Sequence, residues 1–344
     1  MDYETLYNII YALAARDGRE AALFGDCAPY AREAFSRSLV GDAFPELWFE
    51  IPLTGNPWFD FHALVSRKDV AEGQSTYAEY CGPYADALAW LVAQKPYTVR
   101  QLALSFDTHV HDLEHPAVQL LLGAFDMSVP LAFLEVVGRL DAKDSYRTFV
   151  ESIPQEWYAC YVGTFPGREA SSASRWVRVE CVVGDVLQHA YANDAAKLRE
   201  HLARVGLGSL CESAIADIRR LAQTPFPLEF QFNVGPNGKA LPVLSASVRL
   251  QPVDWKEVSR RNAIDSLVGW LQSRNLADDR CALLPQTVFA KRVTRGDFST
   301  TIYCLPAFVK LRWREGMPPD AKAYLLAGIQ GEYIRQRKDG RYDS

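Results

Sequence analysis

The chain has 344 residues, of which 49% are hydrophobic and 23% charged, so a globular protein with a sizeable core is expected. Its formal net charge of −5 disfavours nucleic acid and anionic membranes as main partners, because both require basic surfaces. The longest apolar run, residues 118–138, is interrupted by Asp126, Pro130 and Glu135, so no insertion into a membrane is expected.

The first residues show no basic segment followed by an apolar core, so no secretory signal is expected. The seven cysteines are dispersed and show no CxxC spacing, which is typical of reduced cytosolic thiols that serve mostly as small core residues. We therefore expect a soluble cytoplasmic protein, folded as a single domain over residues 1–344.

Helix-like and strand-like patterns follow one another along the whole chain. Helices show apolar residues on one face at a period near 3.6, and strands show strict alternation. In chain order we predict helices over 2–16 and 29–40, strands 47–53 and 58–65, a helix over 76–94, strands 100–107 and 118–125, a helix over 130–140, strands 157–162 and 176–183, two helices within 185–222, strands 226–234 and 244–250, a helix over 255–274, strands 299–304 and 308–313, and a last helix over 321–334.

The clearest strand pair is 226–250. Phe230 and Phe232 alternate with Glu229 and Gln231 before a Gly-Pro-Asn-Gly turn. This period of two gives one apolar and one polar face. Pairs of this kind begin near residues 46, 99, 157, 227 and 299.

Five hairpins joined by local connections favour antiparallel pairing, and ten amphipathic strands avoid open edges by closing into a barrel. The predicted fold is α+β: a ten-stranded antiparallel β-barrel from five helix–hairpin units, with helices outside and polar faces inside. The units lie near 1–66, 76–125, 130–183, 185–250 and 255–334, followed by a polar tail over 335–344.

This element order resembles that of the ABBA, or PT-barrel, aromatic prenyltransferases. The resemblance rests on the first-hairpin strand WFEIPL with Glu50 facing inward, on the fourth hairpin NVGPNGKALPVLSASVRL, and on a final hairpin followed by a closing helix. It implies transfer of a prenyl group from an allylic diphosphate to an aromatic small molecule or a peptide side chain. It implies no required cofactor, with Mg²⁺ as an optional ion.

The chemistry of such a transfer points to the inward-facing residues. Arginine suits bidentate contact with phosphate, and aromatic faces stabilise cations. Glu50 would accept the proton of the acceptor or orient it. The predicted diphosphate ligands are Arg178, Arg249, Lys310 and Arg312, and the predicted aromatic lining is Trp48, Trp58, Trp157, Tyr161 and Trp176.

Two other functions stay open. The loop Asp107-Thr-His-Val-His-Asp-Leu-Glu-His115 resembles the HxH metal motif of amidohydrolase and PHP-type hydrolases, in which His109 and His111 would bind a metal ion that activates water. A barrel that binds a small ligand without chemistry is the third reading. For each charged residue, the alternative is the solvated face of a sheet or an ion pair, as between Glu180 and Arg178 or Glu229 and Arg249.

Overall fold

The computed structural model describes residues 22–27, 46–67, 85–95, 97–107, 112–124, 126–170, 175–250, 258–295 and 298–333. The predicted helices over 2–16 and 29–40 and the polar tail over 335–344 lie outside these ranges.

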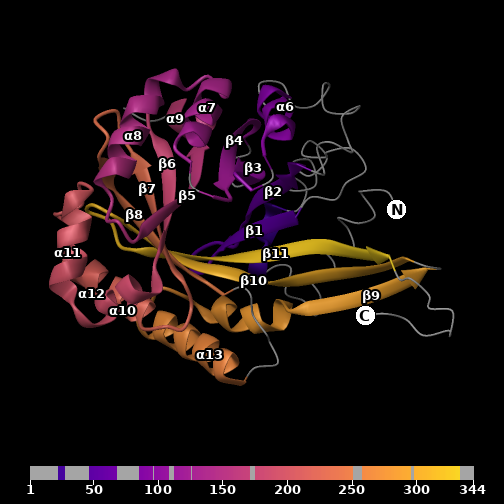
Figure 1. Ribbon diagram of the computed structural model, residues 1–344. Coiled ribbons are helices and arrows are strands. Elements are labelled where there is room, and N and C mark those ends of the chain that lie inside the picture. Colours follow the sequence, from indigo (N-terminus) through magenta and orange to yellow (C-terminus); the bar gives the residue numbers. More distant parts are fainter. Residues whose placement is uncertain are drawn as a thin grey trace.

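Ten strands close into an antiparallel barrel (Figure 1). Each strand pairs with the next one along the chain, and the last returns to the first, with Glu50 opposite Tyr324. The predicted fold class is therefore confirmed. The barrel strands are β1 (Glu46–Pro52), β2 (Asp60–Ser66), β3 (Val99–Asp107), β4 (Asp112–Leu122), β5 (Trp157–Thr164), β6 (Val177–Val183), β7 (Leu228–Val234), β8 (Ala240–Arg249), β10 (Phe298–Arg314) and β11 (Asp320–Tyr333).

Helices pack on the outside of the barrel (Figure 1), and no helix within the described ranges is long and apolar enough to cross a membrane. The α-helices are α6 (Ala85–Ala93), α7 (Ser128–Val136), α8 (Lys143–Ser152), α9 (Pro166–Ala170), α10 (Asp185–Asn193), α11 (Ala195–Arg204), α12 (Glu212–Ala222) and α13 (Val258–Ser273); the 3₁₀ segments are η1 (Gly25–Cys27), η4 (Leu140–Ala142) and η5 (Asp279–Thr287).

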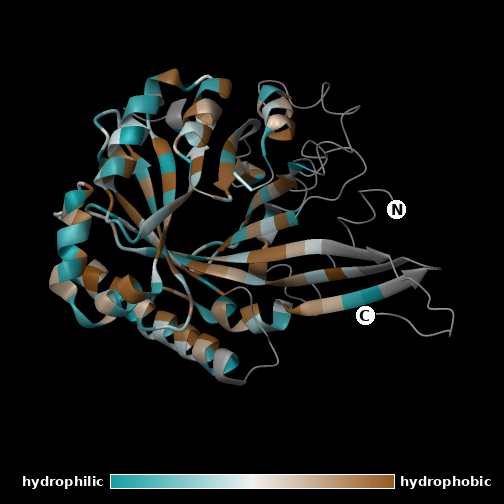
Figure 2. Cartoon of the chain, viewed as in Figure 1, coloured by the Kyte–Doolittle hydropathy of each residue, from teal (hydrophilic) through white to brown (hydrophobic). Residues whose placement is uncertain are grey.

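The main core lies between the barrel and these helices. Phe230 and Phe232 of β7 are fully buried in it, and the ring of Phe149 on α8 lies 5.2 Å from that of Phe232. Figure 2 shows hydrophobic and hydrophilic residues interleaved along the barrel strands. Because alternate side chains point to opposite faces of a strand, the polar residues of the same strands turn into the barrel.

The turn of the fourth hairpin also docks on the helical layer. Gly238 has a positive φ of 71°, a conformation that glycine adopts without strain. A Cβ at this position would lie 2.7 Å from the side chain of Thr148 on α8. The predicted turn is confirmed, and glycine is required there by both conformation and space.

The end of the chain differs from the prediction. Residues 299–304 and 308–313 are not a hairpin but parts of the single strand β10, and residues 321–334 are not a closing helix, since β11 covers most of them. Pro306 is accommodated by an irregularity in the pairing between Pro306 and Phe308, as expected for a residue without an N–H. The Ala- and Leu-rich β11 favours helix locally, but pairing with β10 and β1 overrides that propensity.

An eleventh strand, β9 (Phe289–Arg295), pairs with the first half of β10. It stands outside the closed ring because β8 pairs with the second half of the same strand. In Figure 1, β9 runs with the outer parts of β10 and β11 away from the barrel. The fifth hairpin, which β10 and β11 form, is therefore longer than the other four.

Candidate active site

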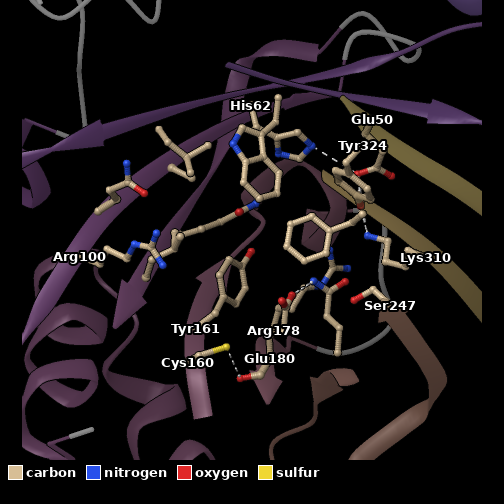
Figure 3. Close-up of a pocket in the computed structure, with 18 of the residues that line it drawn as sticks. Glu50, His62, Arg100, Cys160, Tyr161, Arg178, Glu180, Ser247, Lys310 and Tyr324 are labelled. Carbon is tan, nitrogen blue, oxygen red and sulfur yellow. Dashed lines mark hydrogen bonds and ion pairs between the residues drawn. The ribbon is translucent and has the colours of Figure 1, made fainter. Parts of the chain in front are cut away.

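The barrel encloses a chamber of about 1160 Å³, which includes space open to solvent. Side chains from opposite ends of the chain meet around it (Figure 3). A smaller, more polar cavity of about 470 Å³ adjoins it. The two share Glu50, Arg168, Arg178, Gln231 and Lys310, so the chamber runs from a charged end to a more apolar one.

Glu50 on β1 is the centre of a buried polar cluster. The Tyr324 hydroxyl donates to its Oε2 at 2.5 Å, and the Lys322 ammonium donates to its Oε1. His62 Nε2 lies 3.3 Å and Lys310 Nζ 3.9 Å from Oε2. The carboxylate thus faces donors from its two neighbouring strands, β2 and β11, and from β10.

These contacts change the proton affinity of the cluster. Burial alone would raise the pKa of Glu50, but the charges of Lys310 and Lys322 and the hydrogen bond from His62 outweigh it and hold that pKa well below its usual value. Burial lowers the pKa of Lys310 to about 8, assisted by Lys322 and Arg178 and opposed by Glu50. Glu50 is therefore an anion, and Lys310 is an ammonium that gives up its proton slightly above neutral pH.

Five cations surround the charged end. Arg168 on α9 forms an ion pair with Asp107 and lies 3.9 Å from Asp60. Arg312 donates to Asp320 at 2.9 and 3.1 Å. All five line the smaller cavity, which we call the cation-rich cavity: Arg168, Arg178, Lys310, Arg312 and Lys322.

Arg178 differs from the other four cations. Its Nε donates to the side-chain oxygen of Asn233 at 3.1 Å, and its guanidinium lies 4.1 Å from the ring centre of Phe165 and 5.2 Å from that of Trp176. Within the described ranges no carboxylate forms an ion pair with it. Burial and the nearby Arg168 lower the pKa of Arg178 to about 10, so it remains a cation at neutral pH.

Arg249 lies apart from these cations. It lines the main chamber but not the smaller cavity, and it forms an ion pair with the buried Glu229. Burial and the neighbouring Glu180 raise the pKa of Glu229 well above its usual value. Of the four predicted diphosphate ligands, Arg178, Lys310 and Arg312 therefore line the smaller cavity, whereas Arg249 lines only the main chamber.

Aromatic rings form one wall of the chamber. The ring of Phe308 lies 5.0 Å from that of Trp48 and 6.1 Å from that of Tyr324, measured between centres. Tyr161 lines the chamber on β5. We call Trp48, Phe308 and Tyr324 the aromatic wall.

Three of the predicted aromatic residues, Trp58, Trp157 and Trp176, do not line the chamber. Trp157 points outward, donates to the Tyr191 hydroxyl at 2.8 Å and packs on Phe232. An irregularity between Ala159 and Tyr161 reverses the alternation of β5, which is why Tyr161 faces inward and Trp157 outward.

Trp58 and Trp176 lie at the margins. Trp58 precedes β2, packs against the outer core, and has Lys322 Nζ 4.6 Å from its ring centre. Trp176 stacks on Phe165 at 5.3 Å, and Phe165 rather than Trp176 lines the chamber. Their predicted place in the lining is wrong.

Among the lining residues missed from the sequence are His62, Arg168, Lys322 and Tyr324. Lys322 and Tyr324 alternate with Ala321 and Ala323, a signal that the helical reading of this segment concealed. His62 shares its face with Asp60 and was a visible candidate. Arg168 lies in a Gly/Ser-rich connection, where no period marks the direction of a side chain.

The predicted metal loop is not tested. His109 and His111 lie outside the described ranges. Among the described residues, no three His, Cys, Asp or Glu side chains are grouped to hold a metal ion. Among the described side chains, Cys160, Cys181, Cys211 and Cys281 are free thiols.

Two solved structures share this architecture. The prenyltransferase PriB in its apo form matches with a TM-score of 0.54 and 14% identity, over 93% of this chain and 95% of that one. A 6-dimethylallyl tryptophan synthase matches with a TM-score of 0.53 and 12% identity, over 94% and 96%. No protein-family model and no curated protein sequence matches this chain. The chain therefore has the PT-barrel fold of these prenyltransferases, as the sequence resemblance predicted.

Proposed function

We propose that this protein is a prenyltransferase that moves a prenyl group from an allylic diphosphate to an aromatic small molecule or peptide side chain. The observation that carries the proposal is Arg178, a cation inside the barrel that pairs with no carboxylate of the described chain and that lines both the smaller cavity and the main chamber. The two similar structures, a prenyltransferase and a 6-dimethylallyl tryptophan synthase, support this proposal.

The five cations suit the leaving group. When the allylic C–O bond breaks, its electron pair leaves with the diphosphate, whose charge increases. Arginine binds phosphate oxygens in a bidentate manner, and fixed charges stabilise a developing anion without reorganisation. Arg178 has the most capacity to do so, because its partners in this structure are neutral.

The aromatic wall suits the allylic cation. Rings of Trp and Tyr attract cations through their faces, and a chamber lined by Trp48, Phe308 and Tyr324 limits access of water to the carbocation. The π electrons of the acceptor ring then form the new bond, and the departed diphosphate or water takes up the proton that the ring loses.

Glu50 is placed to orient the acceptor. Its Oε2 already faces Tyr324 and His62, whereas Oε1 has Lys322 as its partner, which leaves acceptor capacity at Oε1 for an N–H or O–H of the substrate. Because its pKa is low, we assign Glu50 the part of a hydrogen-bond acceptor rather than a lasting proton carrier.

We propose further that the reaction requires no metal, since five side-chain cations surround the cavity, and that Mg²⁺ has at most a modest effect on donor binding. We also propose a cytoplasmic location, for which the free thiols are the support.

The test is calorimetric titration with a non-reactive thiolo-diphosphate analogue of an allylic diphosphate, with and without Mg²⁺. We expect micromolar binding, about −8 kcal/mol, followed by product formation when indoles, phenols and peptides are offered with true donors. Binding without turnover on any acceptor would favour the ligand-binding barrel, and no binding at millimolar analogue would overturn the proposal. Stoichiometric transition metal in untagged protein would instead favour a hydrolase at His109 and His111.

A matched pair of variants locates the site. Arg178→Ala is expected to weaken analogue binding by about tenfold to 100-fold, as for the loss of a charged hydrogen bond. Arg249→Ala removes the same charge from the same chamber but outside the cation-rich cavity, and is expected to change binding by less than about threefold. Equal losses in both variants would contradict the assigned position of the diphosphate.

A further inference from the structure

Two neighbouring strands, β2 and β3, share one order of polarity along the inside of the barrel. At one end, Asp60 and Asp107 face Arg168 of the cation-rich cavity. The next inward residues along β2 and β3 are His62 and Ser105, whose side chains share a 2.5 Å hydrogen bond. The order on these strands thus begins with charge and continues with neutral polar groups.

The neutral polar groups form a continuous hydrogen-bonded row across β2, β3 and β4. Gln119 of β4 donates to the Ser105 hydroxyl at 2.6 Å, and that hydroxyl contacts His62 Nδ1. Figure 3 shows His62 beside Glu50 and Tyr324 at this level of the chamber. The row marks the boundary of the charged end.

Aliphatic side chains follow on all three strands. Leu64, Ala103 and Leu121 each lie two residues beyond the polar row, about 7 Å further along the strand, and all three line the chamber. Leu64 and Ala103 are direct cross-strand partners, with only 4% and 2% exposure. We call Leu64, Ala103 and Leu121 the aliphatic wall; Leu122 lines its edge.

The aliphatic wall is separate from the main core. Its three residues are absent from the large hydrophobic cluster between barrel and helices, whereas their chain neighbours Ala63, Val65 and Leu102 belong to it. Apolar side chains that face a chamber rather than a packed core lose contact energy unless a ligand fills the space. The wall is therefore suited to an apolar ligand segment.

The aliphatic and aromatic walls occupy different arcs of the barrel. The aromatic wall belongs to β1, β10 and β11, and the aliphatic wall to β2, β3 and β4. A planar acceptor ring gains most from stacking on rings, which leaves the aliphatic arc for a chain. A polar rim ends this arc, where Gln101 donates to Glu46 at 3.3 Å and Arg100 also lines the chamber.

We propose that the preferred donor is a ten-carbon allylic diphosphate, such as geranyl diphosphate, whose second isoprene unit binds the aliphatic wall. This inference rests on the proposed function. With the diphosphate on the cations, the first isoprene unit lies beside the polar row, and a five-carbon chain ends there. The second unit reaches Leu64, Ala103 and Leu121, and a third meets the polar rim.

The experiment compares inorganic diphosphate with the thiolo-diphosphate analogues of dimethylallyl, geranyl and farnesyl diphosphate by calorimetry on the full chain. We expect the geranyl analogue to bind at least tenfold more tightly than the dimethylallyl analogue, and the farnesyl analogue to gain nothing further. Equal affinity of the five- and ten-carbon analogues, or a tenfold gain for farnesyl, would overturn the inference while leaving the proposed function in place. Failure of all four ligands to bind would overturn both.

Variants assign the effect to the wall. Leu121→Ser is expected to reduce the geranyl-to-dimethylallyl affinity ratio at least threefold and to leave inorganic diphosphate binding unchanged; Leu121→Ala is a milder change at the same contact if the serine variant folds poorly. Leu131→Ser, at a half-buried leucine of α7 outside the barrel, is the matched control and is expected to preserve the ratio. An unchanged ratio in both Leu121 variants would contradict the assignment.

Discussion

The two faces of the barrel wall carry opposite kinds of side chain on the same strands. On β7, the outward Phe230 is fully buried in the main core, and the inward Gln231 lines the chamber. On β10, Val309 packs outward and Lys310 faces inward. The outer face supplies burial of apolar area, which stabilises the fold, whereas the inner face holds charges at a cost in desolvation. Neighbouring residues on these strands therefore have different parts: one stabilises the fold from the outer face, and the next lines the chamber.

The largest expected effect tests the outer face. Phe230→Ala should reduce the free energy of unfolding by about 3–5 kcal/mol, because it leaves a cavity in the core, as measured by urea denaturation. Its neighbour Gln231→Ala loses one hydrogen bond to Glu180 and should cost less than about 1.5 kcal/mol. Similar losses of stability in both variants would contradict the division of the barrel into a stabilising outer face and a functional inner face.

The inner face should affect chemistry more than binding. Glu50→Gln is expected to lower the rate of prenyl transfer at least about 100-fold, because a neutral amide no longer stabilises the positive charge that develops on the acceptor in the transition state. Donor-analogue affinity should be equal or tighter, because the variant removes a negative charge beside Lys310 and Lys322. Glu212→Gln, at an exposed ion pair of α12 with Arg199, is the control. A parallel loss of rate and affinity in Glu50→Gln would place the residue in donor binding instead.

Donor binding should also depend on pH through Lys310. In the empty chamber burial lowers the pKa of this ammonium to about 8, and a bound diphosphate would raise it again. Above about pH 8, binding must then take up a proton, so affinity falls as pH rises, by at most about tenfold per pH unit. Glu50, Lys322, Arg178 and Glu180 face the same group. Lys310→Arg, which stays charged, should flatten the dependence measured by titration between about pH 8 and about pH 10; an unchanged slope would exclude Lys310.

The smallest expected effect concerns a polar chain on the outer face. Trp157 donates to the Tyr191 hydroxyl, which contacts His201 Nδ1 at 2.6 Å. Burial lowers the pKa of His201, against the opposing charge of Glu200. When the pKa of a histidine is lower in the folded than in the unfolded protein, the neutral ring contributes stability at pH values above the unfolded-state pKa. This stability is lost as the pH falls below that pKa.

Stability should therefore decline on acidification with a slope from this group below about 1.4 kcal/mol per pH unit. His201→Gln should reduce the decline between about pH 7 and about pH 5 in urea denaturation, relative to the unaltered protein. A steeper decline in the variant would show that His201 protonation is not disfavoured by folding.

The sequence by itself determined the barrel and the direction of much of its lining. The alternation of two is a local property of a strand, so the paired strands from β1 to β8 and the inward positions of Glu50, Arg178 and Lys310 could be predicted without knowledge of their neighbours. The same local logic failed for residues 321–334, where helix-forming alanines and leucines are held in a strand by β1 and β10 on either side.

Only the tertiary structure decided which inward residues meet. The pairing irregularity before Tyr161 turns Trp157 out of the chamber, and the one at Pro306 lies just before the inward Phe308 and Lys310. Arg178 lines the cation-rich cavity, whereas Arg249 lies outside it beside Glu229. Such groupings depend on register and strand tilt across the whole ring, and neither is encoded in the alternation of a single strand.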